Sequence, residues 1–494
     1  MSVTCFTTPS PETEKVFCFA RATRDGFYLE HETATFKQGF DCAGVISPLS
    51  NIARTEPHQY DVIVVGAGYA GLTACRDLCI AGFSALLLEA RDRIGGRTYT
   101  AEIDGHFYEM DGTWVHWNQP HTYREMSRHG FTELSESHIE QRTGNNYCTT
   151  NFDGKGQDLD HKMVHKHAMT ERAFTRLCDV DGKSGRTVIP YPHNPHHIPE
   201  AKQWEQLSVA QRLEQIKLDL TSDEIAVLQA RLSSICGTDM EKAGFFDVLM
   251  WWALGGYTMD GLYETGDQFK TRTGQSVFAR YFFEEALQTH NIEYSFNTAV
   301  ESIQDLGDRI IVKEKWLVSR LICTVPLNVL QKVRFEPALS SAKMAAARRG
   351  QVNLGAKFHL EVVGSALRPW SGACWPFTRV CSASGDGLTP AGNAHVVCWG
   401  SNKAFPTAKQ DARDFVWHDW SKDPFSEGSW CMFPPGFSFE YLEALQQRAG
   451  NILFASSDWA LGWRGYIDSA IERGTLAAKD VSSELGFAMR DGRC

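Results

Sequence analysis

A glycine-rich turn between an apolar run and a helical pattern constrains this sequence more than any other feature. Residues 61–65 are mostly β-branched and apolar, as in a buried strand of a parallel sheet. Gly66, Gly68 and Gly71 follow in the order G-x-G-x-x-G. In that order the first glycine permits a tight turn, the second lets a pyrophosphate approach the backbone, and the third lets a helix pack on the strand. The pattern predicts a helix over about residues 69–80 whose N-terminus faces phosphate.

A second apolar run, residues 85–88, ends in an acid at the distance that a nucleotide fold requires. This residue, Glu89, can accept a hydrogen bond from a ribose hydroxyl, and it suits an adenosine without a 2′-phosphate. Residues 89–97 read E-A-R-D-R-I-G-G-R, with a second glycine pair flanked by arginines. These glycines allow the backbone to run against a flat or charged ligand, and Arg97 can neutralise a pyrophosphate.

The motifs together resemble the FAD-binding signature of the flavin-containing amine oxidase superfamily. The resemblance continues in Y-E-M-D-G-T-W-V-H-W at residues 108–117 and in D-W-A-L-G-W-R-G-Y-I-D-S-A-I-E-R-G at residues 458–474. It covers nearly everything from residue 61 to residue 485 and is strongest to the soluble fungal monoamine oxidases. The implied fold class is α/β and α+β, the amine oxidase (GR2-type) flavoprotein fold. In this fold a Rossmann-like FAD-binding domain is interleaved with a substrate-binding domain of mixed sheet and helices.

The chain has 494 residues, which is too long for one core and suits two large domains or an interleaved pair. We expect an N-terminal extension that drapes over the body, an FAD-binding domain in three pieces and a substrate-binding domain in two. These are residues 1–56 for the extension, 57–130, 266–330 and 451–494 for the FAD-binding domain, and 131–265 and 331–450 for the substrate-binding domain.

The resemblance implies FAD-binding positions in each motif. They are Gly66, Gly68, Ala70, Gly71, Glu89, Ala90, Arg91, Gly96, Arg97, Gly112, Thr113, Trp114, Val300, Asp458 and Ile467. Residues 291–302 read as strands that contain Val300, where family members meet the adenine through the backbone. A helix that begins near Ile467 can direct N–H groups at the flavin O2. Ser429 stands where membrane-bound relatives attach FAD through a cysteine, so we expect noncovalent FAD, with Cys431 as the only rival thiol.

Three residues match the catalytic positions of the family. Trp430 in E-G-S-W and Tyr466 in W-R-G-Y-I-D match its aromatic cage, which faces the flavin with the substrate nitrogen between the rings. Lys357 in V-N-L-G-A-K-F matches the lysine that holds a water at flavin N5. An amine with a pKa of about 10.4 costs about 4 kcal/mol to neutralise near neutral pH. An apolar, aromatic site without a carboxylate lowers this cost. Three further aromatic residues line the substrate route or belong to a packed helix face, and these are Trp251, Trp252 and Tyr257.

The implied function is an FAD-dependent amine oxidase of the monoamine oxidase type. An amine is oxidised to an imine, which water hydrolyses to an aldehyde or ketone, while O2 is reduced to H2O2. Aliphatic, benzylic and alkaloid-like amines all fit. Two alternatives stay open: a flavin-dependent dehydrogenase or oxidative cyclase acting on a nitrogenous secondary metabolite, and a noncatalytic flavin-binding relic.

Composition argues against several other classes of protein. The net charge is −11 and no basic patch is interleaved with aromatics, so we expect no nucleic-acid partner. No apolar run reaches the ~18 residues of a membrane helix, and the final D-G-R-C is not a peroxisomal S-K-L address. We therefore expect a cytoplasmic protein, with peroxisomal placement open by family analogy and a homo-oligomer also open. The cysteines are scattered singly, which favours reduced thiols, and the histidines at 161–167 and 193–197 lack the partners of a metal site.

Two segments depart from the family pattern. The hairpin at residues 313–316 lacks the usual D-G turn, and the connection over residues 400–420 is short enough to lack a helix. The second departure borders the substrate-binding sheet and puts the shape of the pocket in question.

Overall fold

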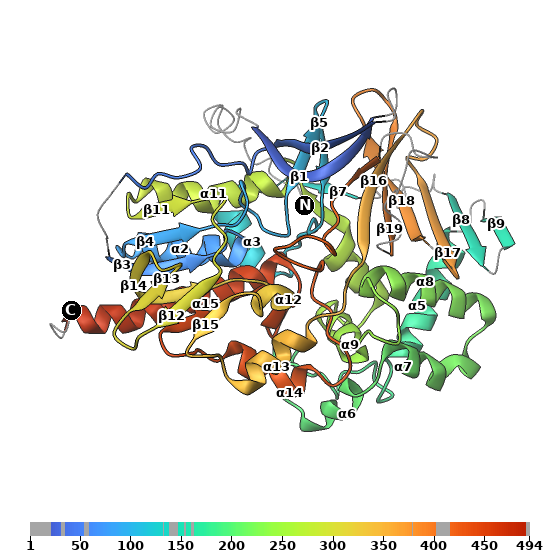
Figure 1. Ribbon diagram of the computed structural model, residues 1–494. Helices are drawn as coiled ribbons and strands as arrows, with labels where there is room; N and C mark the ends of the chain where they lie inside the picture. The colour runs from blue at the N-terminus through green and yellow to red at the C-terminus, as the bar shows by residue number, and fades with distance from the viewer. Residues whose placement is uncertain are drawn as a thin grey trace, which may run out of the picture.

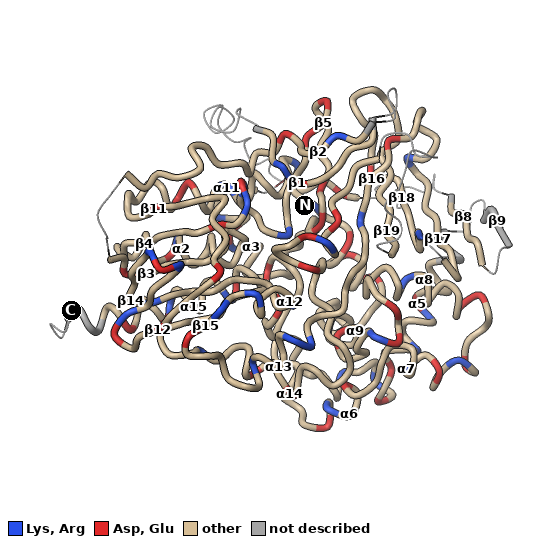
Figure 2. The backbone as a smooth tube through the Cα atoms, viewed as in Figure 1, with Lys and Arg blue, Asp and Glu red and all other residues tan. Residues whose placement is uncertain are grey.

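The structure is a computed structural model that describes residues 21–30, 35–53, 59–131, 133–137, 147–152, 155–159, 163–377, 379–401 and 415–490. Figure 1 shows two halves side by side. The left half is a sheet covered by helices, and the right half is a larger, curved sheet above a group of helices. Figure 2 shows acidic and basic residues interspersed over both halves rather than gathered on one element.

The sheet of the left half has eight strands and is mainly parallel at its centre. Its order is β11-β4-β3-β14-β13-β12-β15, and β21 pairs with β14. The parallel pairs join β11, β4, β3, β14 and β21. The strands are β3 (Gln59–Val65), β4 (Ala85–Leu88), β11 (Ile292–Ser295), β12 (Ser302–Asp305), β13 (Ile310–Val312), β14 (Trp316–Cys323), β15 (Arg334–Glu336) and β21 (Ile452–Phe454).

Strand β3 is buried on both faces, which explains its continuous apolar sequence. Val62 and Val64 belong to one hydrophobic cluster, and Ile63 and Val65 belong to the cluster on the other face. The first cluster is completed by helices α2 (Tyr69–Ile80), α11 (Gln275–Gln288) and α15 (Ile467–Arg490). The second includes residues of α12 (Leu327–Leu330), α13 (Ser341–Arg349) and α14 (Ser438–Gln446). The predicted strand, turn and helix around the glycines are therefore present, and α2 has the predicted bounds.

The sheet of the right half has eleven strands in the order β6-β5-β2-β1-β20-β16-β19-β18-β17-β8-β9. The strands are β1 (Arg21–Glu30), β2 (Thr35–Cys42), β5 (Thr100–Ile103), β6 (His106–Glu109), β8 (Tyr147–Phe152), β9 (Lys155–Leu159), β16 (Ala356–Val362), β17 (Trp370–Trp375), β18 (Val380–Leu388), β19 (Ala394–Gly400) and β20 (Phe415–Trp417). Strand β1 pairs with β20, with Phe27 opposite Trp417. The N-terminal segment thus supplies two strands rather than only draping over the body, because Phe27 stacks on Trp417 and both join a buried cluster.

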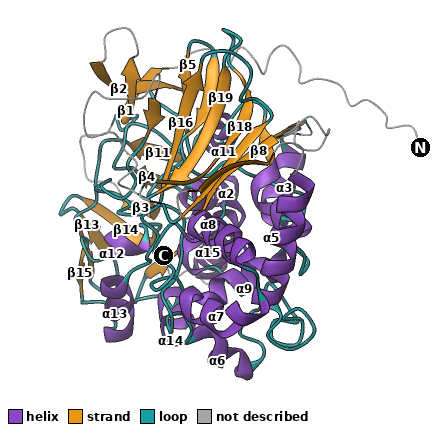
Figure 3. Cartoon of the chain, turned by 90° about the vertical axis from the view of Figure 1, so that its right-hand side faces the viewer, coloured by secondary structure: helices purple, strands orange, loops and turns teal. Residues whose placement is uncertain are grey.

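Helices lie beneath this sheet, as Figure 3 shows in purple below the orange strands. Capping boxes start two of them, Ser208 with Gln211 on α7 and Thr221 with Glu224 on α8. These helices are α5 (Met163–Cys178), α6 (Lys202–Glu205), α7 (Val209–Ile216), α8 (Ser222–Cys236), α9 (Phe245–Leu254) and α10 (Met259–Tyr263). Helix α3 (Pro120–Arg128) belongs to the other half, where it packs against α15. A single π-helical turn, η3 (Glu264–Gln268), follows α10 and leads into β10 (Phe269–Thr271), which pairs with β7 (Leu134–Glu136).

One expectation about the segments that we singled out is contradicted, and one departure from the family pattern is tolerated by the fold. Val300 lies between β11 and β12 and not in a strand, so that expectation was wrong. The unusual hairpin closes without glycine, because Lys313 and Glu314 both adopt positive φ, 50° and 56°, and Val312 pairs with Trp316. Most of the shortened connection, residues 402–414, lies outside the described residues. In the described part of the chain no helix is long and apolar enough to cross a membrane.

Candidate active site

A single cavity of about 1210 Å³ runs from the glycine turn to the helices under the large sheet. It exceeds the ~300–1,000 Å³ of sites for drug-sized ligands, so it has room for a dinucleotide and a second molecule. Its wall combines the turn after β3, the segment after β4, strands β16 to β18, and residues of α8 and η3. The cavity therefore joins the two halves of the fold.

The glycine turn is built for close backbone approach. Gly66 has φ 102°, and its N–H donates to the Leu88 carbonyl at 2.8 Å. A Cβ added at Gly71 would lie 1.9 Å from the Gly66 carbonyl oxygen, so only glycine fits there. At Gly68 the nearest atom to an added Cβ is Gly96 Cα, 3.8 Å away, so that position opens on the cavity. Gly71 thus serves packing, whereas Gly68 keeps space for a ligand.

Glu89 is held as a buried acceptor at the edge of the cavity. The residue is 6% exposed, and its carboxylate accepts from Ala67 N at 2.6 Å and from Arg91 N at 2.8 Å. Each carboxylate oxygen keeps a further lone pair for a hydroxyl of a bound ribose. The geometry suits the role that the sequence predicts for this acid.

Two of the three arginines of the second motif, Arg91 and Arg97, are oriented by buried carboxylates. Arg91 forms two hydrogen bonds with Asp423, at 2.6 and 2.8 Å. Arg97 donates to Asp458 Oδ1 at 2.5 Å and to the Ser429 carbonyl at 2.8 Å. Asp458 is fully buried and does not line the cavity, so it positions Arg97 rather than facing a ligand.

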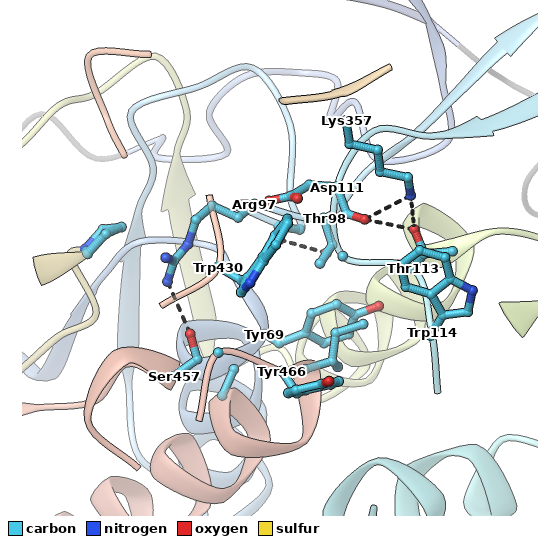
Figure 4. A pocket seen from close by; sticks show the side chains of 18 of the residues that line it. Tyr69, Arg97, Thr98, Asp111, Thr113, Trp114, Lys357, Trp430, Ser457 and Tyr466 are labelled. Carbon is cyan, nitrogen blue, oxygen red and sulfur yellow. Dashed lines mark hydrogen bonds between the residues drawn. The ribbon is translucent and has the colours of Figure 1, made fainter. Parts of the chain in front are cut away.

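Lys357 on β16 projects into a polar corner of the cavity, shown in Figure 4. It is 3% exposed, and its Nζ donates to the Asp111 carbonyl at 3.1 Å and to Thr113 Oγ1. The ammonium also lies 4.8 Å from the centre of the Trp114 ring. Burial lowers the pKa of Lys357 to about 8, although nearby carboxylates oppose the shift.

Asp111 is a site residue that the sequence analysis did not single out. It lines the cavity, and burial raises its pKa to about 6. Its Oδ1 accepts a hydrogen bond of 2.7 Å from the Ser429 hydroxyl. Our expectation of a site without a carboxylate is therefore wrong for this wall. The position of Asp111 directly before Gly112 in D-G-T-W is the signal that could have found it.

Trp430 and Tyr466 both line the cavity, and they come from two loops, one before α14 and one directly before α15. The indole N–H of Trp430 donates to the Ile235 carbonyl at 2.9 Å, which fixes the plane of the ring. Tyr466 packs edge-on against Trp463 and Trp251, with ring centres 5.1 and 6.4 Å apart. Trp251 also lines the cavity.

The other two candidate aromatics of the substrate route serve packing. Trp252 donates to the Ser184 carbonyl at 2.9 Å, and Tyr257 donates to the Ile189 carbonyl. Neither lines the cavity.

The structure brings the predicted site residues together with two exceptions, Gly71 and Asp458, which lie behind the wall. The residues that line the cavity are Gly66, Gly68, Ala70, Glu89, Ala90, Arg91, Gly96, Arg97, Gly112, Thr113, Trp114, Val300, Lys357, Trp430, Tyr466 and Ile467. Helix α15 begins at Ile467, as predicted.

In the described part of the chain, the cysteines and histidines form neither a disulfide nor a metal site. No disulfide joins the cysteines described there, and no group of three or more metal-ligating side chains comes together. His167 contacts Asp260 and His196 contacts Ser438, whereas His161 and the side chain of His165 lie outside the described residues. Cys431 is buried off the cavity, and burial raises its thiol pKa.

A parallel β-α-β unit with a glycine turn and a buried acid after its second strand, opening on an aromatic cavity with a buried lysine, is typical of a flavin-type oxidoreductase. The profile of the family described as "flavin containing amine oxidoreductase" matches residues 69–397 and 383–482. The chain belongs to this family of FAD-dependent enzymes, which act on CH–NH groups. The predicted superfamily and fold class are confirmed, while the finer resemblance to soluble fungal members stays a prediction.

Relatives and solved structures extend this likeness over most of the chain. A pseudooxynicotine dehydrogenase from a Pseudomonas species is 30% identical over 450 residues, which span 86% of this chain and 87% of that protein. A nicotine dehydrogenase from Pseudomonas putida is 29% identical over 86% of this chain and 89% of its own. A solved A394C mutant of putrescine oxidase has a TM-score of 0.73 at 19% identity and covers 87% of this chain and 100% of its own.

Proposed function

We propose that the chain oxidises a small-molecule amine to an imine and passes the electrons to O2, forming H2O2, with FAD held noncovalently. The observation that carries the proposal is the common cavity of Lys357, Trp430 and Tyr466 with the glycine turn and Glu89. When bound, FAD supplies the hydride acceptor for the carbon next to the substrate nitrogen. The proposal includes an FAD-binding domain made of three chain segments and a substrate-binding domain made of two. It also includes the site residues named above.

The residues of the chain fit the FAD group. Gly68 and Gly96 both line the cavity, and their backbones lie so close that a Cβ at Gly96 would come 3.2 Å from Gly68 Cα, so the two glycines keep this part of the wall free of side chains. Glu89 suits the ribose, and Arg97 suits the pyrophosphate. The Ser429 hydroxyl, which stands where a thiolate would be needed, donates its hydrogen bond to Asp111. The buried Cys431 does not line the cavity, so no reactive thiolate is offered to the flavin by either residue.

Trp430 and Tyr466 would prepare the amine for oxidation. Aromatic walls disfavour the ammonium form, because a charged group loses water there without a paired anion. Lys357 would act on the oxygen side, since its ammonium can hold a water through hydrogen bonds and offer positive charge to developing anionic oxygen. Both roles need only the orientation that Ile235 and Thr113 already give to Trp430 and Lys357.

Anaerobic mixing of the yellow protein with primary, secondary and cyclic amines tests the proposal. Bleaching of the blue flavin band by an amine supports amine oxidation, and persistent colour with every amine contradicts it. A dehydrogenase is the second candidate, because the two bacterial relatives carry that name. Admission of O2 to the bleached protein separates the two. Fast return of colour with stoichiometric H2O2 indicates an oxidase, and slow return indicates another acceptor.

A further inference from the structure

Two polar side chains in the cavity wall have no hydrogen-bond partner among the described residues. Gln268 is 6% exposed and Ser384 is 7% exposed, and both line the cavity. Neither side chain has a hydrogen bond within the part of the chain that the structure describes, and neither is among the polar atoms sealed off by protein. Other polar groups of the same wall are satisfied, for example Ser137 by Trp114 and Thr324 by the Val65 carbonyl. Because buried polar groups are nearly always hydrogen bonded, this pair indicates a ligand.

Gln268 and Ser384 lie on neighbouring elements of one wall. Gln268 ends η3, and Ser384 is in the middle of β18. Two residues beyond each, the ion pair of Lys270 with Asp386 joins the elements at 2.6 Å. The ion pair holds β10, which directly follows Gln268, against β18, so the amide and the hydroxyl line adjoining parts of the cavity wall.

This wall adjoins the aromatic cage. A Cβ added at Gly266 would lie 3.1 Å from the Tyr466 hydroxyl, so the middle of η3 lies against the cage. Gln268 stands two residues further along η3. On the other side, Trp114 forms an isolated β-bridge with Lys270, and the Lys357 ammonium lies over the Trp114 ring. An amine held by Tyr466 can thus extend a second group to Gln268.

The charge of this wall favours an uncharged second group. Asp267 is paired with Arg231, and Asp386 with Lys270. Asp260 contacts His167, and both are largely exposed. Glu264 is 47% exposed and thus solvated by water. No buried carboxylate in the described wall near Gln268 remains for a second ammonium, whereas an amide and a hydroxyl offer both donors and acceptors.

We infer that Gln268 and Ser384 form a subsite for a neutral hydrogen-bonding group of the substrate, a carbonyl, hydroxyl or heteroaromatic nitrogen, at the end remote from the oxidised C–N bond. This inference rests on the proposed function and names its substrate class. It separates the enzyme from one that selects plain alkylamines or diamines. The amide would donate to an acceptor or accept from a hydroxyl, and loss of such a bond typically changes affinity about threefold to tenfold.

Matched substrates test the subsite. We would compare 4-phenylbutylamine with its 4-hydroxyphenyl and pyridyl analogues and with 1,4-diaminobutane, in wild type, Q268L, S384A and Q203L. Binding is read from the perturbed flavin spectrum, and reduction from anaerobic bleaching. Gln203 is exposed and does not line the cavity, so Q203L controls for the loss of an amide elsewhere.

The expected result is a preference of about threefold to tenfold for a polar analogue over the phenyl compound in wild type and Q203L. In Q268L, and to a lesser extent in S384A, that ratio should fall toward one. The inference is overturned if wild type shows no preference, if it prefers the diamine, or if both variants keep the preference. Spectral binding measures the ratio even where no amine bleaches the flavin, a result that would defeat the proposed function alone. If Q268L fails to fold, the preference of S384A for the polar analogue over the phenyl compound still tests the inference.

Discussion

The Ser429 hydroxyl donates a 2.7 Å hydrogen bond to Asp111 Oδ1, and this bond ties the loop before Trp430 to the segment before Thr113. Because the serine is committed to Asp111 and a hydroxyl is a poor substitute for a thiolate, we predict that the flavin is not covalently attached. Acid precipitation should leave a colourless pellet and release all flavin into the supernatant. A yellow pellet would contradict this expectation and point to Cys431, which C431S would then identify.

A second prediction concerns the proton on Lys357, which burial shifts to a pKa of about 8. The ammonium form exists below that pH and is lost above it. If its charge assists oxygen, the rate at which O2 restores the flavin colour should fall as pH rises through about 8. In K357M the rate should be low and flat across this range, with the flavin still bound. Stopped-flow reoxidation at several pH values measures both, and an unchanged pH profile in K357M would rule out this role.

A third prediction separates the aromatic cage from general packing. Trp430→Ala removes one wall of the cavity and should lower kcat/KM by roughly tenfold, because contacts between aromatic groups contribute about 0.5–1.5 kcal/mol beyond burial. Flavin content should be retained, since the indole bonds to Ile235 and not to the glycine turn. Trp117→Ala is the matched control, because Trp117 is exposed and does not line the cavity. Equal kinetics in the two variants would refute the assignment of Trp430.

Alanine substitutions at Gly68 and Gly71, the two later glycines of the first motif, should have different effects on the protein. At Gly71 the added methyl meets the Gly66 carbonyl at 1.9 Å, so Gly71→Ala should destabilise the protein with or without FAD. At Gly68 the nearest atom is 3.8 Å away, so Gly68→Ala should leave the melting temperature of the apoprotein almost unchanged while weakening FAD binding. Thermal melts of apoprotein and holoprotein, with FAD titrations, measure the contrast. A normal FAD affinity in Gly68→Ala would show that this backbone does not face the cofactor.

The fold could be predicted where its determinants are local. The turn after β3, the bounds of α2 and the start of α15 follow from motifs of a few residues. Strands β1 and β2 were missed, because they depend on the pairing of Phe27 with Trp417, which is about four-fifths of the chain away in sequence. Asp111 and Gln268 were also missed. The D-G-T-W motif could have pointed to Asp111, but its hydrogen bond with Ser429 depends on tertiary packing. The place of Gln268 in the cavity wall also depends on tertiary packing, and a glutamine does not signal a ligand by itself.

The hairpin between β13 and β14 offers a prediction about stability. Lys313 and Glu314 both adopt the left-handed conformation, which costs a residue with a Cβ roughly 1 kcal/mol and costs glycine much less. Lys313 also donates from Nζ to the Ala299 carbonyl at 2.6 Å, so it should be kept. We therefore expect Glu314→Gly to raise the melting temperature by a few degrees or less, since ~1 kcal/mol is spread over a large unfolding entropy. Glu314→Ala is the control, because it removes the same exposed carboxylate, and its contact with Arg334, without relieving the backbone. If the alanine variant proves as stable as the glycine variant or more so, the turn carries no relievable strain, and the family's D-G pair is not needed to close this hairpin.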